Sequence, residues 1–142
     1  MMGFKGRSRP CSDADARRRM ARAREFLEVA DLAMSERDPT DHSYVYSNAA
    51  ASLAVLAGIA ASDAACCKAV GRHATGESHQ EATQLLEQVT PGGKDAAKDL
   101  NVLLGLKERA QYGAMALGGQ DLRKVVRRAE KLCDFREDVL RR

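Results

Sequence analysis

The feature that most constrains this fold is a stretch of twenty residues, Ser43–Ser62, in which no side chain is charged. Residues 48–62 of it are almost all Ala, Ser, Leu, Val and Ile. A helix of this composition is apolar nearly all round, so other helices must cover it. The stretch is about long enough to cross a membrane. Because it is rich in Ala and Ser, contains Asn48 and is followed by Asp63, we expect a buried helix of a soluble protein and no membrane partner.

The rest of the chain also favours helix. Ala is abundant, charged residues make up 30% of the 142 residues, and β-branched and aromatic residues are sparse. This length suits one domain with a real core. We therefore predict an all-α fold, an up-and-down bundle of four to five helices around the central Ala-rich helix.

Apolar periodicity and loop residues predict where the helices lie. Residues 1–11 are expected to be a disordered basic tail, and residues 12–142 a single bundle. Ser12 and Asp15 suit the cap of the first helix. Gly58 falls within the second helix at a cost of about 1 kcal/mol relative to Ala, which close approach of another backbone would offset. The expected helices cover about 13–35, 42–71, 77–89, 95–116 and 120–140.

Charge is distributed unevenly along the chain. The formal net charge is +3, but residues 1–24 carry a balance of +6 and residues 122–142 one of +4, so the centre is acidic. Basic ends can contact phosphate or an acidic partner, because charge of one sign steers association. A solvated helix face with a basic tail gives the same pattern, so both interpretations stay open.

The four cysteines have the spacing of neither a disulfide framework nor a zinc module. They are Cys11, Cys66, Cys67 and Cys133. Free buried thiols in a reducing cytosol are therefore expected, with no metal and no cofactor. The basic start of the chain is not followed by an apolar segment of the secretory type, which agrees with a cytoplasmic location.

Two polar features are candidates for ligand binding. Lys107, Arg109 and Tyr112 lie within two turns of one predicted helix, and a guanidinium beside a phenol suits phosphate or nucleotide binding. His79 opens another predicted helix, where free N–H groups favour anions. A surface helix with a packed tyrosine and a polar first-turn histidine are the alternatives.

Two arginine–histidine pairs have the loose spacing of a ribonuclease motif. They are Arg72 with His79, across a Gly-rich break, and Arg37 with His42, across a loop that contains Pro39. Neither pair lies on one helix, and a histidine that acts as general acid or base needs its partner within reach. Arg72 and His79 are kept as candidate catalytic residues.

The order of these motifs resembles the HEPN domain family (higher eukaryotes and prokaryotes nucleotide-binding) over about residues 20–140. The matching segments are Ala-Arg-Glu-Phe-Leu-Glu-Val-Ala-Asp-Leu-Ala at 23–33, the small-residue helix from Tyr46, Ser78-His79, and Lys107-x-Arg109-Ala-x-Tyr112-Gly113. The resemblance implies a bundle of four or five helices that forms a homodimer. It also implies a toxin–antitoxin or defence setting, often beside a nucleotidyltransferase partner.

Active members of that family are metal-independent ribonucleases with an Arg-x4–6-His motif on a late helix. Here no histidine follows Arg109, so the chain is closer to the non-catalytic branch. The resemblance assigns ligand binding to His79, Arg109 and Tyr112, with Lys107 beside them. We expect a binding protein for a nucleotide, RNA or protein partner. An endoribonuclease toxin and a purely structural interaction protein are the alternatives.

Overall fold

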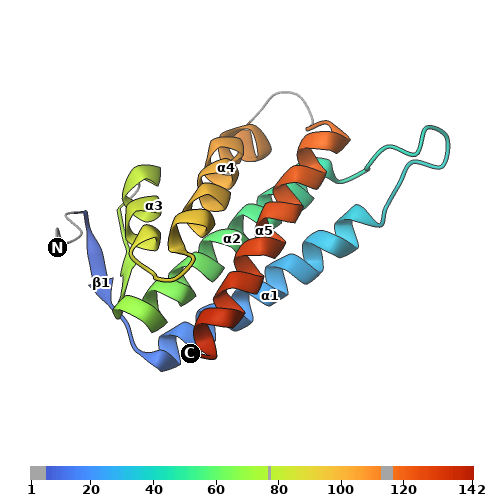
Figure 1. Cartoon of the computed structure of the whole chain (residues 1–142). Coiled ribbons are helices and arrows are strands. Elements are labelled where there is room, and N and C mark those ends of the chain that lie inside the picture. Colours follow the sequence, from blue (N-terminus) through green and yellow to red (C-terminus); the bar gives the residue numbers. More distant parts are fainter. Residues whose placement is uncertain (1–5, 77, 113–116) are drawn as a thin grey trace.

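The computed structural model describes residues 6–76, 78–112 and 117–142, and their side chains except those of 108–112. This part of the chain forms five helices, which confirms the predicted all-α bundle (Figure 1). The described helices are α1 (Asp13–Met34), α2 (Ser47–Val70), α3 (His79–Glu87), α4 (Gly93–Tyr112) and α5 (Gly119–Leu140).

Helix α2 lies at the centre of the bundle and contacts the other four helices. More than half of its residues are buried, on all sides of the helix, as its uncharged sequence predicts. Its length and hydropathy would allow it to cross a membrane, but 72% of its most apolar window is buried inside the protein. The central helix therefore forms the core of the fold.

Gly58 allows α4 and α5 to pack closely on α2. A Cβ atom at this position would overlap Leu103 of α4 and lie 3.2 Å from Cδ1 of Leu132 of α5. We expected another backbone at this contact, and that expectation was wrong. Leucine side chains from two helices fill the space instead.

The N-terminal segment differs from the expected disordered tail. Residues 8–10 form strand β1 (Ser8–Pro10), which pairs in antiparallel fashion with β2 (Arg72–Ala74), with Arg9 opposite His73. Residues 1–5 of the expected tail lie outside the described residues. The strand is short and half polar, so its sequence lacks the alternation that would predict it.

A disulfide between Cys11 and Cys67 fixes this segment to the end of α2. The expectation of four free thiols was therefore wrong for these two cysteines and correct for Cys66 and Cys133, which are free and buried. The bridge joins residues 56 positions apart. Sequence spacing gives no sign of such a contact, because the fold alone brings the two cysteines together.

The loop before α2 is longer than predicted, so α2 begins at Ser47 rather than near His42. His42 has a φ of 62°, a left-handed conformation that a helix does not contain. Arg37 and Tyr44 form an isolated antiparallel bridge that closes the loop. The predicted start of α1 is confirmed, because Ser12 and Asp15 form a reciprocal capping box.

Candidate functional site

A cavity of about 490 Å³ lies beside α2, between α3, α4 and the end of β2. Apolar side chains of these elements and several polar or charged side chains line it together. This volume is within the usual range of small-molecule sites. The lining residues are Ile59, Ser62, Asp63, Cys66, Ala74, Gly76, Ser78, His79, Ala82, Leu85, Leu100, Leu104 and Lys107.

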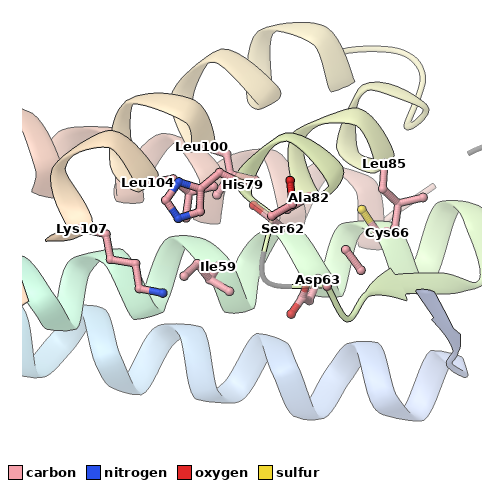
Figure 2. Close-up of a pocket in the computed structure, with 13 residues that line it drawn as sticks. Ile59, Ser62, Asp63, Cys66, His79, Ala82, Leu85, Leu100, Leu104 and Lys107 are labelled. Carbon is pink, nitrogen blue, oxygen red and sulfur yellow. The ribbon is translucent and has the colours of Figure 1, made fainter. Parts of the chain in front are cut away.

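His79 and Lys107 line this cavity together, although they come from different helices. In Figure 2 the Lys107 side chain extends from α4 toward Ile59 of α2, and the His79 ring lies along the same cavity. His79 is the first residue of α3, and the Ser78 hydroxyl caps that helix by accepting a hydrogen bond from the Glu81 amide at 3.4 Å. This cap fixes the start of α3 and therefore the position of His79 on the cavity wall.

Asp63 is the acidic group of the cavity. Burial raises its pKa to about 7, and the Arg19 guanidinium, 3.8 Å away, only partly opposes this. Near neutral pH the carboxyl group therefore exists in both the protonated and the ionised form. In either form it can accept a hydrogen bond, and when protonated it can donate one.

The other polar groups on the α2 wall are unreactive. The Ser62 hydroxyl donates a hydrogen bond to the Gly58 carbonyl at 2.9 Å. Burial, with a smaller contribution from Asp63, raises the pKa of the Cys66 thiol, so Cys66 stays protonated. Since the thiolate is the nucleophilic form, Cys66 is poorly suited to nucleophilic chemistry.

Arg19 links Asp63 to His73 on the side of the cavity nearest α1. Its Nη2 atom lies 3.1 Å from Nε2 of His73, while Nδ1 of His73 lies 3.3 Å from the Ala74 carbonyl. Because an arginine can only donate, Nε2 accepts and the Nδ1–H group faces the carbonyl oxygen. Burial and the Arg19 charge lower the pKa of His73, which favours this neutral ring.

The candidate catalytic pair Arg72 and His79 is not brought together. Arg72 lies on β2 and hydrogen-bonds to β1, through Nε to the Ser8 hydroxyl at 2.7 Å and through Nη2 to the Ser8 carbonyl at 3.1 Å. It does not line the cavity that holds His79. Its guanidinium joins β2 to β1. The spacing between Arg72 and His79 in the sequence therefore did not indicate a shared catalytic site.

The structure tests the remaining predicted residues only in part. The side chains of Arg109 and Tyr112 lie outside the described residues, so their place relative to the cavity stays a prediction. Sequence reasoning missed Asp63, Cys66 and Ser62. The one available signal was Asp63 itself, the first charge after the uncharged stretch of α2.

No known protein family matches the chain, and no characterised protein is similar to it in sequence. The resemblance to HEPN domains therefore stays a prediction. Within the described ranges, no group of three or more His, Cys, Asp or Glu residues is arranged to hold a metal ion. The function must be argued from the cavity.

Proposed function

We propose that this protein is a HEPN-like, non-catalytic binding module that takes a nucleotide into the cavity lined by His79 and Lys107. The resemblance adds the expectation of a homodimer in a toxin–antitoxin or defence system, with a nucleotidyltransferase as a possible partner. The single observation that carries the proposal is the cavity itself. It joins apolar walls to a cationic group from α4 and the first residue of α3.

The apolar walls suit a flat base. Ile59, Leu100 and Leu104 come from α2 and α4 and give part of the cavity an apolar surface on which a base can pack. Asp63 offers a carboxyl group to the N–H groups on the edge of a base. The volume of the cavity, about 490 Å³, suits a small molecule, so we favour a mononucleotide over an RNA chain or a protein partner.

The phosphate would bind near Lys107 and His79. Lys107 brings an ammonium group to the wall of the cavity, and an ammonium group can bind the phosphate of a nucleotide. His79, the first residue of α3, lines the same cavity, and a helix N-terminus favours negative charge.

A calorimetric titration with AMP and ATP tests the proposal. We expect Lys107→Ala to weaken binding roughly tenfold, because it removes a charge-assisted contact. Lys98→Ala is the matched control, since Lys98 lies on the same helix, pairs with exposed Asp95 and does not line the cavity. Ala82→Leu should abolish binding by filling the cavity, with thermal melts confirming that the variant folds.

Equal nucleotide affinity in wild type, Lys107→Ala and Ala82→Leu would exclude this cavity as the site.

Incubation with labelled RNA tests the ribonuclease alternative in the same preparation. Cleavage by wild type that is lost in His79→Ala would show catalysis and contradict a non-catalytic module.

A further inference from the structure

A second groove, of about 390 Å³, lies where the loop before α2 meets the start of α5. Its described lining shares no residue with the nucleotide cavity. Ser47 in this groove and Ile59 in the cavity are both on α2, and the helical rise puts them about 18 Å apart along its axis. The groove residues are Arg37, His42, Ser43, Tyr44, Ser47, Leu117, Gly118, Gly119 and Arg123.

Two arginines converge on one tyrosine in this groove. The Arg37 guanidinium lies over the Tyr44 ring, 3.9 Å from its centroid. Nη1 of Arg123 donates a hydrogen bond to the Tyr44 hydroxyl oxygen at 3.4 Å. The ring therefore holds two positive charges close together. Arg37 is further oriented by a hydrogen bond from its Nε to the His42 carbonyl at 2.8 Å.

This pair of cations lacks an acidic partner within the described residues. Asp38 accepts hydrogen bonds from the amides of Thr40 and Asp41, and Asp41 accepts one from the amide of Ser43, so both carboxylates serve the loop. Asp121 in the first turn of α5 is also engaged in an interaction of its own. Two like charges at one ring repel each other unless an anion joins them.

The start of α5 adds backbone donors to the same groove. Gly118 caps the helix and has no side chain to bond the first amides. A Cβ at Gly119 would lie 3.2 Å from both Nη1 of Arg123 and Cε2 of Tyr44, so the Gly119 backbone lies directly against the arginine–tyrosine pair. The absence of a side chain at Gly119 lets the two side chains approach the first turn of α5 this closely.

We propose that this groove binds a phosphate group that carries two negative charges, either free inorganic phosphate or the terminal phosphate of a nucleotide. Arg37 and Arg123 supply the charge-assisted hydrogen bonds, and Tyr44 keeps their guanidinium groups in place. The first amides of α5 complete the site. The inference is independent of the cavity, because the residues of the two sites are separate.

Nuclear magnetic resonance tests the site with inorganic phosphate as the probe. We expect the amide signals of Gly118 and Gly119 to shift with saturation as phosphate is added to wild type. In Arg37→Gln/Arg123→Gln the affinity should fall roughly tenfold or more. Lys124→Gln, which removes a neighbouring exposed cation outside the groove, should bind as wild type does.

Parallel titration with AMP separates the two sources of the ligand. Tighter saturation by AMP than by phosphate assigns the groove to a nucleotide, and equal affinity assigns it to free phosphate. Signals that do not move, that drift linearly without saturation, or that respond alike in wild type and the double variant would overturn the proposal. Lys107 lines the cavity and not the groove, so Lys107→Ala should leave the phosphate-induced shifts of Gly118 and Gly119 unchanged. A failure of the cavity proposal can therefore be distinguished from a failure of the groove proposal.

Discussion

The carboxyl group of Asp63 lies 3.8 Å from the guanidinium of Arg19, and both side chains are more than two thirds buried between α2 and α1. At this distance the attraction does not offset the loss of water around the carboxylate, so the pKa of Asp63 is raised to about 7. The charge state of this pair therefore changes near neutral pH.

Stability should fall as the pH rises from about 5 to 8. The folded protein keeps a proton on Asp63 up to about pH 7, whereas the unfolded chain loses it near 3.8. The unfolded state thus binds fewer protons in this window, and the stabilising contribution is lost as pH passes the folded pKa. We expect a loss of about 2 kcal/mol in the free energy of unfolding, measured by urea denaturation.

Asp63→Asn keeps the shape of the side chain and removes its titration. The difference in the free energy of unfolding between wild type and this variant should therefore change with pH. Because His73 is present in both proteins, its titration cancels in this difference, and the titration of Asp63 remains. The lowered pKa of His73 acts in the opposite direction, because stability then rises as pH increases through its unfolded value of 6.5. A difference that stays constant from pH 5 to 8 would show that Asp63 does not titrate there.

The disulfide should contribute a large share of the stability. Cys11 and Cys67 close a loop of 56 positions, and the loss of chain entropy in the unfolded state corresponds to about 4 kcal/mol. Cys11→Ala/Cys67→Ala should lower the free energy of unfolding by about this amount in a urea titration. Wild type in a strong reductant should unfold at nearly the same urea concentration as the variant.

The matched control is Cys133→Ala, which replaces a free buried cysteine. Because this variant keeps the Cys11–Cys67 bridge, reductant should lower its stability by as much as it lowers that of the wild type, whereas Cys11→Ala/Cys67→Ala should not respond to reductant. A wild type that loses nothing on reduction would show that the bridge does not form or does not constrain the unfolded chain.

The central helix and the core were largely predictable from the sequence because they depend on local patterns. The uncharged stretch predicts the burial of α2, and Leu122, Val125 and Leu132 recur at helical spacing and are all buried on α5. The cap at Ser12 follows the same local logic. Such features require only neighbours along the chain.

The site was predictable only in part, because its chemistry depends on distant contacts. His79 and Lys107 were chosen for their positions on helices, and the fold places both along one cavity. The burial that shifts the pKa of Asp63 arises from packing against other elements, which periodicity does not reveal. Arg72 shows the opposite error. Its spacing from His79 suggested a catalytic role, but its hydrogen bonds to Ser8 hold the two strands together.

Substitution of Gly58 tests how tightly the helices pack. Gly58→Ala adds a methyl group that overlaps Leu103, which costs about 1 to 3 kcal/mol, while better helix propensity returns about 1 kcal/mol. We expect a net loss of about 1 kcal/mol. Combining it with Leu103→Ala should cost less than the sum of the two single changes, because the new cavity accepts the methyl group.

Gly105→Ala is the control for helix propensity. Gly105 lies on α4, and a Cβ there would meet no atom within 4 Å. This variant should gain about 0.5 to 1 kcal/mol in the free energy of unfolding. If Gly58→Ala raises the free energy of unfolding by as much as Gly105→Ala does, Leu103 does not pack closely against α2 at Gly58.

Arg136 is a fully buried charge that holds α5 to α1. Its Nη1 donates to the Met20 carbonyl at 3.0 Å, and its Nη2 donates to Glu137, 3.1 Å away, which also binds Arg24 of α1. Arg136→Met should lower the free energy of unfolding by about 3 kcal/mol, because it removes two charge-assisted hydrogen bonds of a buried guanidinium, to the Met20 carbonyl and to Glu137, and so disrupts the link between the helices. Arg141→Met, at an exposed position one turn on, should change it by less than about 0.5 kcal/mol. Equal urea midpoints for the two variants would show that the buried guanidinium does not stabilise this contact.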